Sequence, residues 1–300
     1  MAKNRFLALK VCADTEEKKP SYDREVATLS MLKKDWHPNI IAFGSAFKDR
    51  DQLCVSLELA NMSLEDALRD TNKLDVETAK HIATGIARGI SHLHGHQILH
   101  RDIKPENVLL TGAFSNHAII SDFGLSISLK NKPMGVRGEC GTTRYRAPEM
   151  RGMNYYSYPI DVYAYGVTVY RIVGGQFPVQ GGLGQLTNME AKGLVGQLMD
   201  KVVGSRLEID KALEHSFFQV LELDQKSNSS SGGSSKRPLD GVTVQGHDTK
   251  RARHDNGDVL EGMYDSVHIS FSARPIGQIH SLEVIKHTLT VDDDHPCSSI

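Results

Sequence analysis

The sequence predicts an α+β fold in which a small strand-rich part precedes a mainly helical part. Short apolar runs with a two-residue alternation occupy much of the first sixty residues. Longer runs with helical periodicity follow them. From about residue 223 the composition changes to serine, glycine and charge, which is typical of a flexible linker. We therefore expect one domain over residues 1–222, divided near residue 60 into parts 1–60 and 61–222, and a disordered tail over 223–300.

The bulk composition is that of an ordinary globular protein. With 39% hydrophobic residues, 24% charged residues and a net charge of -2, the whole chain shows no bias toward nucleic acid or membrane surfaces. Its four cysteines are scattered without a C-x-x-C pair, which favours a reduced, intracellular setting. No run approaches the roughly 20 apolar residues of a membrane helix. Neither a membrane nor a nucleic acid is expected as a partner.

The strand-rich part begins with a short apolar run at residues 6–12 that is bounded by charge. Residues 22–34 have apolar side chains at helical spacing, with Ser21 as the expected N-cap and His37-Pro38 as the stop. Residues 40–47 and 52–59 alternate as two strands joined by a charged turn.

The helical part contains two long apolar helices. The first is expected over residues 76–94 and the second over 158–173, with a shorter helix at 63–69 before them. Residues 108–110 and 118–120 are expected to be short strands around a Thr-Gly turn. Further helical patterns run through Met199 and Leu213.

Three sequence motifs lie in the helical part. His-Arg-Asp-Ile-Lys-Pro-Glu-Asn occupies residues 100–107, Asp-Phe-Gly occupies 122–124, and Ala-Pro-Glu occupies 147–149. Three such patterns in this order do not arise by coincidence. Over about residues 5–220 the chain resembles the eukaryotic protein kinase family. The resemblance implies a two-lobed fold, with an incomplete N-terminal sheet lobe and a mainly helical C-terminal lobe.

The resemblance also implies the chemistry of these motifs. Asp102 would be the catalytic base and Lys104 the group that neutralises the transferred phosphoryl, while Asn107 and Asp122 would bind Mg²⁺. A lysine two residues after Asp102 resembles the Ser/Thr-directed members of the family. ATP and Mg²⁺ are therefore the expected cofactors, and protein serine or threonine hydroxyls the expected substrates. An inactive copy of the site remains an alternative.

Two further segments resemble the family's ATP-binding features. Lys10 ends Leu-Ala-Leu-Lys, which is similar to the strand whose lysine holds the ATP phosphates, and Glu25 would be its partner. Leu57-Glu58-Leu59-Ala60 resembles the hinge, where the backbone of Glu58 and Ala60 would bind adenine. An ordinary strand end is the alternative for the hinge.

The loop before Ala-Pro-Glu resembles the family's regulatory and substrate-docking segment. Arg101, Thr142 and Thr143 are the implied residues there, and we expect Glu139 to mimic a phosphate by pairing with Arg101. A solvated loop glutamate is the alternative. Other phosphorylation candidates are Ser126 and Ser128. By resemblance, Asp161 would anchor the catalytic loop, and Glu149 would pair with Arg206.

The sequence departs from the family before Lys10. Only nine residues precede it, so no Gly-x-Gly-x-x-Gly loop is present, and an uncovered sheet edge and impaired turnover are expected. The alternative function is a catalytically weak kinase-like scaffold or truncated isoform that acts through protein interactions.

The tail carries two basic clusters. Lys236-Arg237 and residues 250–253 fit a bipartite nuclear-localisation pattern, so a nuclear import receptor is an expected partner and a nuclear or nucleo-cytoplasmic location is expected. A merely solvated basic patch remains the alternative.

Overall fold

The computed structural model describes residues 5–152, 154–174, 177, 183–184, 186–219 and 287–289. All of them belong to one unit, which comprises residues 1–228 and 282–300. The linker and the basic clusters expected in the tail lie outside the described residues. In the part of the chain that is described, no helix has the length and apolar character needed to span a bilayer.

A twisted sheet forms the N-terminal lobe. Its strand order is β2-β3-β1-β9, with β1 over Arg5–Ala13, β2 over Phe43–Asp49 and β3 over Gln52–Glu58. Neighbouring strands are antiparallel, and Lys10 on β1 lies opposite Val55 on β3. The second strand therefore starts at Phe43, later than the alternation from residue 40 predicts.

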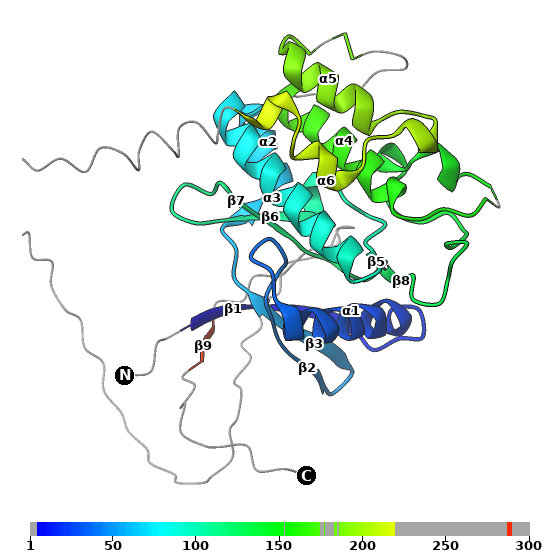
Figure 1. Cartoon of the computed structure of the whole chain (residues 1–300). Coiled ribbons are helices and arrows are strands. Elements are labelled where there is room, and N and C mark those ends of the chain that lie inside the picture. The colour runs from blue at the N-terminus through cyan, green and yellow to red at the C-terminus, as the bar shows by residue number, and fades with distance from the viewer. Residues whose placement is uncertain are drawn as a thin grey trace, which may run out of the picture. The chain divides into compact units, whose positions relative to one another are not determined.

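Helix α1 (Lys19–Leu32) lies against β2 and β3, as Figure 1 shows. Its buried residues Leu29 and Leu32 belong to the main core. The prediction that Ser21 caps this helix is wrong. The helix begins two residues earlier, with Pro20 in its first turn, and the Ser21 hydroxyl instead donates to the carbonyl of Gly124.

The outer edge of β1 is partly paired. Strand β9 (His287–Leu289) runs antiparallel to β1 over Arg5–Leu7. The expectation of an uncovered edge is therefore wrong for this stretch, because a segment near the end of the chain forms the ladder there.

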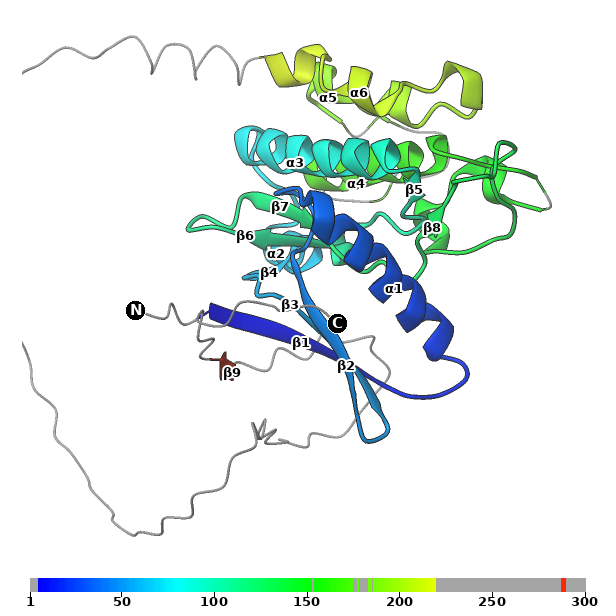
Figure 2. The same ribbon diagram turned by 60° about the horizontal axis from the view of Figure 1, so that its bottom comes forward.

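The C-terminal lobe is built around α3 (Val76–Gly95) and α4 (Pro159–Gly174), which pack side by side. In Figure 2, α5 (Met189–Leu198) and α6 (Ile209–Ala212) lie on the far side of this pair from the sheet. Helix α2 (Leu64–Thr71) begins with a reciprocal capping box between Ser63 and Asp66. The hydroxyl and carboxylate satisfy backbone N–H groups that the first turn would leave unbonded.

Short strands and 3₁₀ turns lie between the helices of this lobe. The strands β4 (Met62–Ser63), β6 (Val108–Thr111) and β7 (His117–Ile120) form one small sheet, and β5 (Ile98–Leu99) pairs with β8 (Ile127–Ser128). The single 3₁₀ turns of this lobe are η2 (Pro105–Asn107), η3 (Thr143–Tyr145), η4 (Pro148–Met150) and η5 (Val203–Ser205), while η1 (Lys33–Asp35) belongs to the N-terminal lobe and lies between α1 and β2. This arrangement is the α+β fold with a small sheet lobe and a helical lobe that the sequence predicts.

Candidate active site

A lysine and two carboxylates meet where the two lobes face each other. The Nζ of Lys10 lies 2.8 Å from both carboxylate oxygens of Glu25 and 3.1 Å from Oδ1 of Asp122. The three residues come from β1, from α1 and from the loop after β7. Burial by itself would lower the pKa of Lys10, but the two carboxylates outweigh it and raise that pKa. Lys10 is therefore a charged ammonium, and it lies between the carboxylates of Glu25 and Asp122.

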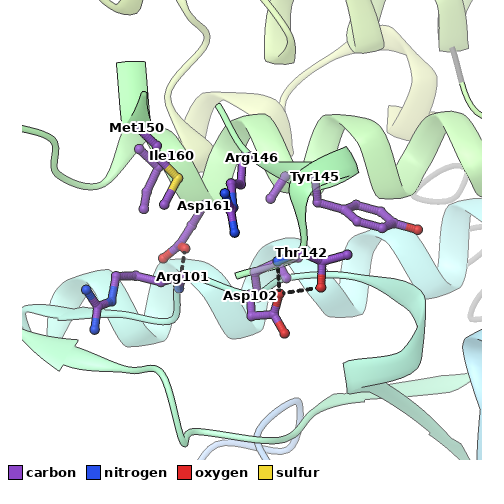
Figure 3. Close-up of a pocket in the computed structure, with 10 residues that line it drawn as sticks. Arg101, Asp102, Thr142, Tyr145, Arg146, Met150, Ile160 and Asp161 are labelled. Carbon is purple, nitrogen blue, oxygen red and sulfur yellow. Dashed lines mark hydrogen bonds between the residues drawn. The ribbon is translucent and has the colours of Figure 1, made fainter. Parts of the chain in front are cut away.

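The Asp102 carboxylate is held on both oxygens. Its Oδ1 accepts hydrogen bonds from the backbone N–H (2.8 Å) and hydroxyl (2.9 Å) of Thr142, as Figure 3 shows. Its Oδ2 lies 2.9 Å from the ammonium of Lys104 and 2.9 Å from Nδ2 of Asn107. Burial raises the pKa of Asp102, but Lys104 and Thr142 more than offset it, so the pKa is lowered and the group is a fixed anion.

Asn107 and Asp122 each have an oxygen atom available to a cation. Asn107 uses Nδ2 to donate to the carbonyl and the carboxylate of Asp102, so its amide oxygen is the atom left to act as a ligand. The Asp122 side chain is 44% exposed, so an ion can reach it. Burial favours its neutral form, but Lys10 overrides this and lowers the pKa of Asp122. An ionised carboxylate and an amide oxygen are hard donors that suit Mg²⁺.

Asp161, at the start of α4, fixes the loop that carries Asp102. Its two carboxylate oxygens accept the backbone N–H groups of His100 and Arg101, each at 2.9 Å. Nε2 of His94 lies 3.1 Å from Oδ2. Figure 3 shows Asp161 reaching the Arg101 backbone from the helix above. Arg101 has a φ of 68°, so the loop bends through a left-handed residue that these bonds hold in place.

Apolar residues from both lobes belong to one core. The rings of His100 and Phe123 pack edge to face with their centroids 5.1 Å apart, and both side chains are fully buried. Leu29 of α1 and Phe43 of β2 belong to the same core as Phe123. Apolar residues of the sheet lobe and Phe123 of the helical lobe therefore share one core, and His100 packs against Phe123.

The hinge residues lie where β3 ends and the chain passes to the helical lobe. Leu57 is buried, whereas Glu58 and Ala60 are half-buried. The Glu58 carboxylate accepts the backbone N–H of Ala42 at 2.7 Å, so this side chain fixes the start of β2.

The pairing predicted between Glu139 and Arg101 is wrong. Glu139 lies 3.1 Å from the Arg146 guanidinium and accepts the backbone N–H of Gly152. Arg101 instead donates from Nε to the carbonyl of Leu125 at 2.7 Å and reaches the hydroxyl of Tyr156. The loop folds Glu139 away from Arg101, which no local pattern in the sequence could indicate.

The candidate phosphorylation sites differ in exposure. Thr143 is exposed at the start of η3, and Ser128 is exposed in β8. Ser126 is only 1% exposed, and its hydroxyl bonds to Thr28 and to the carbonyl of Phe123. Modification of Ser126 would require this segment to open.

Glu149 and Arg206 form the ion pair that the sequence suggests. The guanidinium donates from both terminal nitrogens to the two carboxylate oxygens, and Arg206 also donates to the carbonyl of Pro159. This contact joins η4 to the segment after η5.

Sequence reasoning missed three residues that support the site. His94 contacts Asp161, Thr28 bonds Ser126, and Nε of Arg24 donates to the carbonyl of Gly124 at 3.0 Å. His94 and Thr28 lie on helices whose periodicity identifies only a buried face, so the sequence held no signal for these polar contacts.

Comparison with known proteins identifies the family of this chain. The family model for the protein kinase domain matches residues 1–218. The chain is 32% identical over 213 residues to Serine/threonine-protein kinase PLK4 of Aedes aegypti, covering 65% of this chain and 27% of that protein. It is 35% identical over 157 residues to Serine/threonine-protein kinase VIK of Arabidopsis thaliana, and the match covers 50% of this chain and 36% of that protein.

A third relative is matched over most of its length. Myosin light chain kinase A of Dictyostelium discoideum is 30% identical over 239 residues, which cover 71% of this chain and 79% of that protein. The other two relatives are matched over about a third of their length or less. This chain belongs to the eukaryotic protein kinase family.

Proposed function

We propose that this kinase-family chain transfers the γ-phosphoryl group of ATP to serine and threonine hydroxyls of proteins. The observation that carries the proposal is the Asp102 carboxylate, which Thr142, Lys104 and Asn107 hold in one orientation. A carboxylate fixed and ionised in this way is suited to orient an attacking hydroxyl.

The residues present fit ATP and Mg²⁺. Lys10, held by Glu25, supplies a positive charge for the nucleotide phosphates. The oxygens of Asp122 and Asn107 would hold Mg²⁺, which when bound neutralises charge on the phosphates. The backbone of Glu58 and Ala60, at the connection between the lobes, would receive the adenine ring.

The reaction follows from the positions of these side chains. Asp102 accepts the proton of the substrate hydroxyl while the oxygen of that hydroxyl forms a bond to the γ-phosphorus. The bond between the γ-phosphorus and the ADP oxygen breaks in the same step. Lys104, 2.9 Å from Asp102, offsets the charge on the transferred group. The Thr142 hydroxyl receives a bond from Lys104 at 2.8 Å and donates to Asp102, so base, lysine and docking loop are coupled. Lys104, two residues after Asp102, resembles the Ser/Thr-directed members of the family, and this resemblance supports serine and threonine as acceptors.

The test is ATP-dependent phosphorylation of a basic protein substrate by the purified chain, followed by identification of the phosphorylated amino acid. Phosphoserine or phosphothreonine should form with the wild type and with the control variant D70N, which alters an exposed aspartate of α2. D102N should lose about 100-fold or more in turnover, because the general base is removed.

The scaffold alternative predicts a different result. A folded wild-type chain that binds partners but whose phosphorylation equals that of D102N would favour the scaffold. Phosphotyrosine as the only product would overturn the proposed specificity.

A further inference from the structure

A cluster of histidines lies away from the active site, where the end of α3 meets the turn after α1. His92 lies in the last turn of α3, His96 is the residue that caps the end of this helix, and Asp35 is the last residue of η1. One ligand atom from each of these three residues lies within 4.8 Å of the others. No role in the kinase site uses them.

The hydrogen bonds of the cluster define which ring nitrogens can bind a cation. Nδ1 of His96 lies 2.9 Å from the carbonyl oxygen of His92, and a carbonyl only accepts, so this nitrogen carries a proton. A neutral His96 therefore has its lone pair on Nε2, which lies 3.1 Å from Oδ2 of Asp35. Two lone pairs that face each other at this distance repel. Either a second proton on the ring or a metal ion relieves the repulsion.

The spacing suits a metal ion. Ligands bonded to a tetrahedral Zn²⁺ at about 2.0–2.1 Å are about 3.3 Å apart, close to the distance between His96 and Asp35. Nε2 of His92 lies 2.9 Å from the backbone carbonyl oxygen of Asp35, and this hydrogen bond holds the His92 ring beside Asp35. Histidines four residues apart on a helix are a common arrangement for this ion.

The surroundings leave room for a further ligand. A surface hollow beside His92 is lined by His37, Arg88, Ser91, His92 and Leu213, so water can complete the coordination. The His37 ring stacks on His92 at 4.8 Å and restricts its movement. Asp35 is 70% exposed at its side chain, so it can move toward the ion.

We propose that Asp35, His92 and His96 form a binding site for a divalent metal ion of the Zn²⁺ class. Two imidazoles and one carboxylate favour such an ion over Mg²⁺, which prefers oxygen ligands. The bound ion would clamp η1 onto α3. Since η1 directly follows the helix that carries Glu25, the clamp would restrain the junction between the two lobes.

The experiment is calorimetric titration of the full chain with Zn²⁺, on metal-stripped protein that carries no polyhistidine tag. The wild type should bind one ion with micromolar or tighter affinity and melt at a higher temperature with Zn²⁺. H92Q, H96Q and D35N should each weaken binding by about tenfold or more. H81Q is the matched control, because His81 is exposed on the same helix and bonds the carbonyl of Glu77.

Co²⁺ absorption provides a second readout, since d–d bands report tetrahedral nitrogen and oxygen coordination. Circular dichroism of the metal-free variants shows whether each one folds, and D35N, at an exposed position, keeps the test valid if a histidine variant does not. Equal Zn²⁺ affinity of the wild type and D35N would overturn the proposal. Failure of the wild type to bind Zn²⁺ would also overturn the proposal. The contact between Asp35 and His96 would then be an ion pair with a protonated imidazole.

Discussion

The hydroxyl of Thr28, on α1, lies 2.8 Å from the hydroxyl of Ser126 in the segment that follows Asp-Phe-Gly. Ser126 donates to the Phe123 carbonyl at 2.7 Å, so the Thr28 hydroxyl is the donor to Ser126. Both residues are buried. This bond ties the helix that carries Glu25 to the segment that carries Asp122.

Removal of the Ser126 hydroxyl should loosen this connection. S126A leaves the buried hydroxyl of Thr28 without its acceptor, so the free energy of unfolding should fall by about 1–3 kcal/mol in urea denaturation. S128A, at an exposed position two residues on, should change it by less than about 0.5 kcal/mol. If both variants lost the same stability, the buried bond would not be the cause.

The ion pair of Glu149 with Arg206 should stabilise the helical lobe. The side chains are 14% and 1% exposed, so R206A leaves a nearly buried carboxylate unpaired and should cost about 3–5 kcal/mol of unfolding free energy. K211A removes the ion pair between Lys211 and Glu208, whose side chains are 63% and 73% exposed, respectively. This substitution should lower the unfolding free energy by less than about 1 kcal/mol. Thermal unfolding of both variants gives the comparison, and a similar small loss for R206A would contradict this assignment.

The partner of Glu139 can be tested by double-mutant cycles. E139A and R146A should show a coupling free energy of about 0.2–1 kcal/mol, because their side chains form a partly exposed ion pair at 3.1 Å. E139A and R101A should show none in the same denaturation measurements. A coupling with Arg101 alone would restore the pairing that the sequence suggests.

The contribution of Asp161 should depend on pH. Burial raises the pKa of this carboxyl, but the bonds from His94 and from the His100 backbone outweigh burial, so its pKa is lowered from 3.8. Because the pKa of this carboxyl is lower in the folded state than in the unfolded state, its charge stabilises the fold at any pH above the unfolded-state pKa. This stabilisation is lost as the pH falls through the folded-state pKa. D161N should therefore cost about 1.5–3 kcal/mol at pH 7, and the difference from wild type should shrink below pH 3.8.

Denaturant titrations across this range measure the effect, with D70N as the control at an exposed position of α2. A difference between wild type and D161N that stayed constant down to the acid limit would mean that the carboxylate charge is not what stabilises the loop.

Strand β9 makes a prediction about the edge of the small sheet. Deletion of residues 282–300 removes the partner of Arg5–Leu7, so their amides should exchange hydrogen faster, while those of β3 should not change. Exchange followed by mass spectrometry separates the two strands. Equal protection of Arg5–Leu7 in the full and shortened chains would exclude this pairing.

The sequence by itself determined the order of most elements and the family motifs from which the catalytic residues are proposed. The periodicity of residues 76–94 matches α3 closely, because a long amphipathic helix is specified by its own residues. Asp102, Lys104 and Asn107 lie within six residues of one another, so one loop brings them together wherever the rest of the chain goes. Lys10 and Glu25 could be paired only through the family resemblance, since no local rule relates a strand to the next helix.

The tertiary structure decided the contacts between distant segments. Glu139 binds Arg146 instead of Arg101, His94 reaches Asp161, and Thr28 meets Ser126. The loop that contains Glu139 turns through Gly141, which has a φ of 75° and lies so close to the Arg101 carbonyl that a side chain would clash. Such turns set which polar groups face each other, and burial then requires each of them to find a partner, so the packed chain decides these pairs and local sequence does not.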